Sequence, residues 1–185
     1  DVSSRDPWSF MFVASGGERR IGGIIDRLAE DPAQVLVLAA IAAGQLSSQD
    51  AGVSSDEVML NVARVAPGAF GPPTGVLDQA KFNAAFAAVQ GERIVRDSGG
   101  QLRTAHIRVA DRALLELARH TLDAVGEPTR ALVRNHLLNP DGPLLGKYWM
   151  VNTLGRSDSL HGHKWRAQWL DDSAVDALVQ QVLIS

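Results

Sequence analysis

Nine consecutive apolar residues, from Val35 to Ala43, most constrain what this chain can fold into. Asp31 and Pro32 precede them, and an Asp followed by Pro is typical of a helix start. A helix that is apolar on every side must be surrounded by other elements. The stretch is also far shorter than the roughly 20 residues that a membrane span needs. We therefore expect a buried central helix over residues 32–44, ending at Gly44.

Two further helices are predicted after this central one. Ser54 and Glu57 form a capping box at the start of a helix over 54–65, which carries an apolar stripe. Residues 66–75 are rich in Pro and Gly and predict a loop. Apolar residues at helical spacing then predict a helix over 77–90. These two helices are amphipathic, so each can lay one face against the central helix.

The pattern changes to that of a β-hairpin over residues 94–107, with a turn at 97–100. Three helices followed by a hairpin and another helix is the order of a winged helix. The predicted fold class is mainly α with a small β-hairpin: a winged-helix domain over 31–122, flanked by a lid-like helical segment (1–30) and a C-terminal helical region (123–185). The alternative is an unrelated helical bundle with a hairpin insert.

The flanking segments also carry helical patterns. Ile21, Ile24, Ile25 and Leu28 have the spacing of an amphipathic helix. A helix is predicted over 8–15, with a strand over 10–13 as the alternative. Further helices are predicted over 127–138 and 173–184, and Gly126 interrupts the chain before the first of these two.

Composition excludes several classes of function. The 185 residues include no Cys, so disulfides, thiol catalysis and iron–sulfur clusters are excluded, and a reducing compartment is favoured. The net charge is −3, which gives no global attraction to nucleic acid or acidic membranes. No signal peptide or membrane segment is visible, so we expect a cytoplasmic protein with no membrane partner. The chain begins with Asp1, and we favour a piece of a longer polypeptide.

The predicted third helix is poorly suited to reading DNA. Most winged helices that bind DNA use this helix, and they need Arg or Lys to hold phosphates and guanine edges. Residues 77–90 offer one Lys, one Asp and no Arg. The predicted wing region is more basic, and four side chains there are candidates for contact with nucleic acid or a partner, unless they are simply solvated or paired: Arg93, Arg96, Arg103 and Arg108.

The C-terminal third concentrates aromatic residues among cations. Trp165 and Trp169 are candidates for contact with a partner or nucleic acid, although they also suit the core of a small subdomain. His161 and His163 have a spacing that suits a metal ion, but the adjacent lysine and arginine weaken cation binding. We therefore assign no metal site.

Two segments resemble parts of signalling ATPases. Residues 15–21, Ser-Gly-Gly-Glu-Arg-Arg-Ile, followed by two isoleucines, resemble the lid helix of AAA+ ATPases. Residues 101–110 resemble the end of the winged helix in the STAND class of ATPases, where a wing strand runs into a histidine and then a helix. The resemblance spans about residues 8–120, and its motifs are short.

The resemblance implies roles for two residues. Arg19 matches the lid arginine that senses nucleotide phosphate, and His106 matches the winged-helix histidine that contacts phosphate in the resting state. The Pro often found near that arginine is absent, and Ile107 replaces an acidic residue that often follows the histidine. Both side chains are then expected to be partly exposed and unpaired in this chain, and His106→Leu is expected to leave folding nearly intact.

The expected function is regulatory and not catalytic. Residues 142–148 are the nearest match to a phosphate-binding loop, but they lack its spacing and its Ser or Thr after Lys. We therefore expect no cofactor in this chain, with ATP or ADP implied only for a full-length protein. The expected partners are its own ATPase core or other protein domains. A DNA-binding winged-helix regulator is the first alternative, and a small enzyme or metal protein the second.

Overall fold

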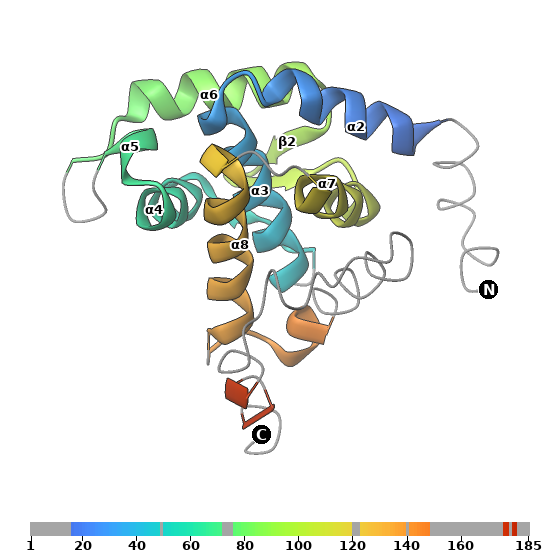
Figure 1. Cartoon of the computed structure of the whole chain (residues 1–185), viewed down its shortest axis with the longest axis vertical. Helices are drawn as coiled ribbons and strands as arrows, with labels where there is room; N and C mark the ends of the chain where they lie inside the picture. Colours follow the sequence, from blue (N-terminus) through green and yellow to red (C-terminus); the bar gives the residue numbers. More distant parts are fainter. Residues whose placement is uncertain are drawn as a thin grey trace.

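The computed structural model describes residues 16–48, 50–71, 76–119, 123–139, 141–148, 176–177 and 179–180. Helices predominate and one small antiparallel sheet joins them, which confirms a mainly α fold with a small β component. Within this described part, no helix combines the length and apolar character needed to cross a bilayer. The helices and strand β2 are labelled in Figure 1. In chain order the elements are α2 (Gly17–Leu28), α3 (Pro32–Ser47), β1 (Val53–Ser54), α4 (Ser55–Val65), α5 (Pro67–Phe70), α6 (Gln79–Gly91), β2 (Val95–Ser98), β3 (Gln101–Thr104), α7 (Ile107–Arg119) and α8 (Asp123–Leu138).

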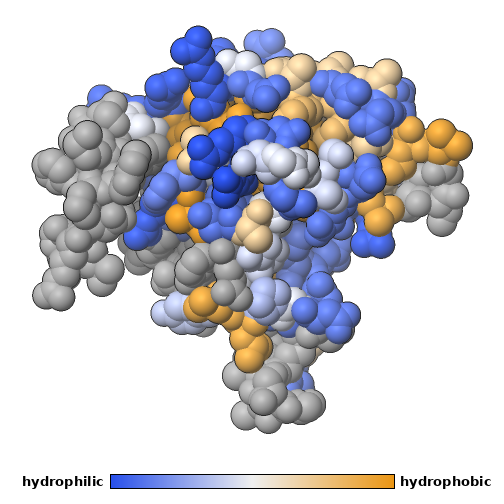
Figure 2. Space-filling model, turned by 180° about the vertical axis from the view of Figure 1, so that it is seen from behind, coloured by the Kyte–Doolittle hydropathy of each residue, from blue (hydrophilic) through white to orange (hydrophobic). Residues whose placement is uncertain are grey.

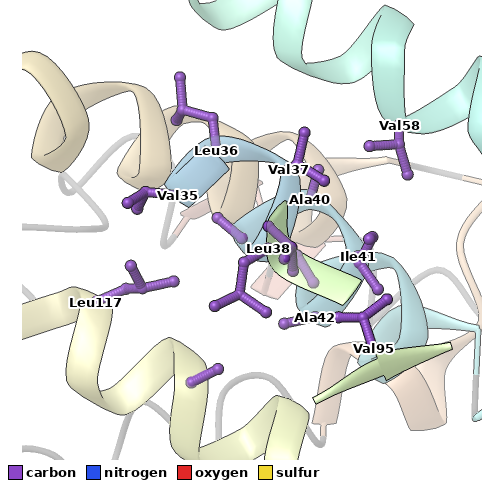
Figure 3. Packing of buried hydrophobic residues seen from close by; sticks show 14 of the residues in the cluster. Val35, Leu36, Val37, Leu38, Ala40, Ile41, Ala42, Val58, Val95 and Leu117 are labelled. Carbon is purple, nitrogen blue, oxygen red and sulfur yellow. The ribbon is translucent and has the colours of Figure 1, made fainter. Parts of the chain in front are cut away.

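Helix α3 is the centre of the core, as its apolar sequence predicts. Thirteen of its 16 residues are buried, and it packs against α4, α6, α7 and α8. Hydrophilic residues cover much of the surface seen from behind (Figure 2). In the interior, Figure 3 shows side chains from three other elements, Val58 of α4, Val95 of β2 and Leu117 of α7, around α3. The Asp31 side chain accepts a hydrogen bond from the Ala33 N–H at 3.0 Å, which caps the first turn.

The prediction that α3 ends at Gly44 is wrong, because the helix continues to Ser47. Gly44 instead allows β1 to approach. A methyl group in place of its hydrogen would lie 3.0 Å from the Cβ of Val53, which is closer than ordinary van der Waals contact. The missing side chain therefore serves packing between α3 and β1 rather than helix termination.

The predicted hairpin is present as β2 and β3. Its turn contains Gly99 and Gly100 at φ values of 66° and 81°, and the Asp97 carboxylate accepts the Gly100 N–H at 2.9 Å. A third strand, β1, was not predicted. It pairs with β3, which gives an antiparallel sheet in the order β1-β3-β2. Two residues are too short a strand for a periodic sequence signal, so β1 depends on its partner β3.

Other boundaries differ from the sequence predictions. The short helix α5 lies inside the segment predicted to be a loop, and α8 begins at Asp123, so that Gly126 lies within it. The amphipathic helix around residues 21–28 is confirmed as α2, whose isoleucines are buried and which packs on α7. The predicted helix over 8–15 lies outside the described residues, and so does most of the one predicted over 173–184.

One buried glutamine connects the central helix to the hairpin. Gln45, at the end of α3, is fully buried, and its Oε1 accepts the backbone N–H of Thr104 on β3 at 2.7 Å. The Thr104 hydroxyl lies 2.7 Å from the same oxygen and 2.8 Å from the His106 carbonyl. The Nε2 group of Gln45 donates to the Asp50 carboxylate. This side chain therefore positions the hairpin against α3 by hydrogen bonds.

Replacing this glutamine tests its structural role. Gln45→Leu keeps the side-chain volume but leaves the Thr104 N–H without its acceptor, so we expect the free energy of unfolding to fall by about 1–3 kcal/mol. Chemical denaturation measures the change. Gln90→Leu on the exposed face of α6 is the control, and we expect a change within about 0.5 kcal/mol. Equal stability of both variants would contradict this role.

Candidate functional site

The outer face of α6 carries very little charge. Phe82, Ala85 and Val89 are buried on its inner side. The Lys81 ammonium donates to the Gly68 carbonyl at 3.2 Å, which directs it along the protein surface. The remaining exposed positions of the helix are small or uncharged: Gln79, Ala80, Asn83, Ala84, Ala87, Gln90 and Gly91. This surface therefore lacks the cations that a DNA-reading helix uses.

Two wing arginines lie directly opposite each other. Arg96 on β2 pairs in register with Arg103 on β3. Their neighbours Val95, Leu102 and Thr104 are buried, so the arginines share the other face of the hairpin. Like charges that face each other across strands are destabilising. An anion between them would relieve this repulsion.

The Arg103 guanidinium group is poorly supplied with hydrogen-bond partners. Its Nη2 group lies 3.4 Å from the Ser98 hydroxyl, a weak contact. Its Nε atom is buried and has no hydrogen-bond partner among the residues that the structure describes. Of the other two predicted arginines, Arg93 is exposed just before β2 with φ of 60°, and Arg108 lies in the first turn of α7, outside the hairpin. The structure thus brings two of the four together.

His106 has a structural role that the sequence analysis missed. The residue is half-buried, and its Nδ1 atom accepts the backbone N–H of Arg108 at 3.1 Å. The His106 carbonyl accepts the N–H of Val109 at 2.8 Å. These contacts are those of an N-cap residue for α7. The expectation of an unpaired His106 is therefore wrong.

Arg19 is exposed in the first turn of α2, as expected. The same helix is tied to the end of α6 by an ion pair: Arg27 Nη2 lies 2.6 Å from Glu92 Oε2, and Nε lies 3.1 Å from Oε1. The hydrogen bonds of this pair lower the pKa of Glu92 and raise that of Arg27. The Arg27 side chain is largely solvated, so the pair orients α2 more than it stabilises the fold.

An open groove between α4 and α8 was not predicted from the sequence. Its volume is about 550 Å³. The polar lining of α4 comes from residues 57, 61 and 64, whose spacing places them on one helix face. That spacing was visible in the sequence, but the partner helix was not. The groove is lined by Glu57, Leu60, Asn61, Arg64, Leu132, Asn135, His136, Leu138 and Asn139.

His136 lies at this groove as a neutral ring. Burial lowers its pKa to about 4, so the imidazole is uncharged at neutral pH. Its Nδ1 atom lies 3.2 Å from the Ser47 hydroxyl at the end of α3. Its Nε2 atom is buried without a hydrogen-bond partner in the described part of the chain. The ring therefore joins α8 to α3 and adds no charge to the groove.

The remaining candidates lie beyond the described structure. His161, His163, Trp165 and Trp169 all fall outside the described residues. Among the residues that are described, no group of three or more His, Asp or Glu side chains could hold a metal ion.

Comparison with known proteins gives no relative for this chain. No family model, no curated protein and no solved structure matches it. The function proposed below therefore depends on the contacts and charges of the chain itself, together with the short motifs of its sequence.

The cap at α7 gives a revised prediction for His106. His106→Leu removes the acceptor for the Arg108 N–H, so we expect the free energy of unfolding to fall by about 0.5–2 kcal/mol. His106→Asn supplies a side-chain oxygen at the cap and should retain most of the stability. Urea denaturation of the two variants measures the difference. If both variants have the same free energy of unfolding as the unmodified protein, the cap contributes nothing to stability.

Proposed function

We propose that residues 31–122 form a winged-helix domain within a non-catalytic regulatory module of a larger, nucleotide-switched ATPase. The element order supports the domain assignment: α3, β1, α4, α6, β2 and β3 follow each other as helix, strand, helix, helix and a two-stranded wing. The strand order β1-β3-β2 brings the first strand beside the wing, as in a winged helix. The short helix α5 is an addition between the second and third helices.

The outer face of α6, on which Lys81 is the one charged residue, is the observation that carries this proposal. Ala80, Ala84 and Ala87 are exposed at the spacing of one helix face. Small side chains let another backbone approach closely, and they offer nothing to hold a phosphate. This surface therefore suits a protein domain better than a DNA groove. In the proposed module, the occupant is the ATPase core of the same protein.

The position of α2 supports a link to nucleotide. This helix carries the lid-like sequence and packs on α7, and Arg27 joins it to Glu92 at the end of α6. Arg19 is left exposed at its other end. A guanidinium in such a position can bind a phosphate group by two parallel hydrogen bonds. The nucleotide, ATP or ADP, belongs to the ATPase core and not to this chain.

The full-length gene tests this proposal. We expect a phosphate-binding loop in the segment that precedes Asp1. In that full-length protein, Arg19→Ala should lower ATP hydrolysis at least about tenfold, because the contact with phosphate charge is lost. The same variant of the present chain should unfold within about 0.5 kcal/mol of the unmodified protein, since the side chain is exposed.

Arg20→Ala is the matched control for this experiment, because Arg20 is also exposed in the same turn. Its effect on hydrolysis should be small. A gene without a phosphate-binding loop before Asp1 would exclude the ATPase proposal, and equal effects of the two variants would remove the assigned role of Arg19.

DNA binding through the wing is the second candidate function. The observation that favours it is the Arg96–Arg103 pair, in which an exposed and a partly buried arginine share one face of the hairpin. Such a pair can hold a backbone phosphate. It carries no base specificity by itself, and Lys81, the one cation of α6, is held at the Gly68 carbonyl. The expected activity is therefore weak and independent of sequence.

A titration of duplex DNA separates the two functions. We expect a dissociation constant of about 10⁻⁴–10⁻⁶ M at physiological salt, the range of non-specific binding. Arg96→Gln should weaken this binding and reduce the salt slope by about 1. Arg64→Gln, on α4, is the control and should leave both unchanged. Sequence-selective binding in the nanomolar range would favour the DNA-binding regulator.

A further inference from the structure

The open groove between α4 and α8 combines an apolar base with a polar rim. Its volume of about 550 Å³ lies within the range of small-ligand sites. Its base is apolar, since Leu132 is buried and Leu60 and Leu138 are partly buried. Its rim is polar and belongs to two different helices. A groove with an apolar base and a polar rim suits a ligand that carries both apolar and polar groups.

Carboxamide groups dominate the polar rim. Asn61 comes from α4, Asn135 from the last turn of α8, and Asn139 directly follows the end of that helix. A carboxamide has both a donor and an acceptor, so it can pair with the N–H and the C=O of one residue in an extended peptide, which point to the same side. Asn139 is partly engaged, since its Oδ1 accepts the Asp141 N–H at 3.1 Å. Asn61 and Asn135 therefore face the groove from opposite helices as the strongest candidates for peptide contacts.

Two side chains of opposite charge lie at the two ends of the part of the rim that α4 contributes. Glu57 and Arg64 are both exposed and are seven residues apart, which corresponds to about 10 Å along a helix. An extended tripeptide spans about the same distance between its amino and carboxylate groups. Glu57 matches the ammonium end and Arg64 the carboxylate end, while Asn61 lies between them.

We propose that this groove binds a short peptide with free termini, held by Glu57 and Arg64 at its ends and by Asn61 and Asn135 along its backbone. The apolar base accepts the central side chain. Such a ligand forms ion pairs with both charged side chains of the rim, whereas a simple anion would be repelled by the Glu57 carboxylate. Nothing in this site depends on the nucleotide-switched function, so the two proposals can be tested separately.

Titration of the isotope-labelled chain with the tripeptide Ala-Leu-Ala tests the proposal. At neutral pH we expect NMR shift changes confined to amides of α4 and of residues 132–139, with a dissociation constant of about 0.1–1 mM, as suits a ligand of this size. The same tripeptide with an acetylated N-terminus and an amidated C-terminus lacks both charges. It should bind at least tenfold more weakly, since each charged end contributes charge-assisted hydrogen bonds.

Two asparagine variants distinguish peptide binding in the groove from binding elsewhere on the surface. Asn61→Leu keeps the side-chain size but removes the carboxamide, and should weaken binding of Ala-Leu-Ala at least tenfold. Asn83→Leu, on exposed α6, should bind like the unmodified chain. The NMR spectrum of Asn61→Leu without peptide should differ from that of the unmodified chain only near residue 61, which shows that this variant is folded.

Three outcomes would overturn the proposal. One is the absence of shifts in α4 and α8 up to about 10 mM peptide. Another is equal binding of the free and capped peptides, which would show that the rim charges are not used. The third is unchanged affinity in Asn61→Leu.

Discussion

Burial of α3 on every side is the constraint on which the rest of the structure depends. A helix without a polar face is stable in water only when neighbours cover its whole circumference. Its small residues, among them Ala39, Ala40 and Gly44, let those neighbours approach closely. Helices α4, α6, α7 and α8 and the hairpin all contact it. The arrangement of the chain is therefore largely the set of elements needed to cover one apolar helix.

Gln45, a polar residue near the end of α3, fixes the position of the hairpin on that helix. Apolar contacts are non-directional, so burial of Val95 and Leu102 alone would allow the hairpin to shift along α3. The hydrogen bond from the Thr104 N–H to Gln45 Oε1 has a defined length and direction. It holds β3 in register with the helix end, and β3 in turn holds β1 and β2. The outward position of Arg96 and Arg103 follows from this register.

Local sequence signals predicted the elements well and their contacts poorly. The caps at Asp31 and Ser54 lie where the sequence places them, because a cap depends on its own turn. Strand β1 and the close approach at Gly44 could not be predicted, since both depend on residues far away in the chain. The exposure of Arg19 was predicted, whereas the cap formed by His106 was not. The groove was missed because its two helices are separated by about seventy residues and have no shared sequence pattern.

Because the core occupies every face of α3, functional surfaces must lie on the outer sides of the surrounding elements. The outer face of α6, the arginine face of the hairpin and the groove between α4 and α8 lie on different elements around α3. All of them pack on α3, and α6 also contacts β2 directly. A close-packed interior responds to local shifts by moving between discrete arrangements rather than by continuous deformation. The groove reaches that core through His136, whose ring contacts Ser47 at the end of α3, two residues beyond Gln45. A ligand that displaced α8 would therefore act on the same helix end that positions the hairpin.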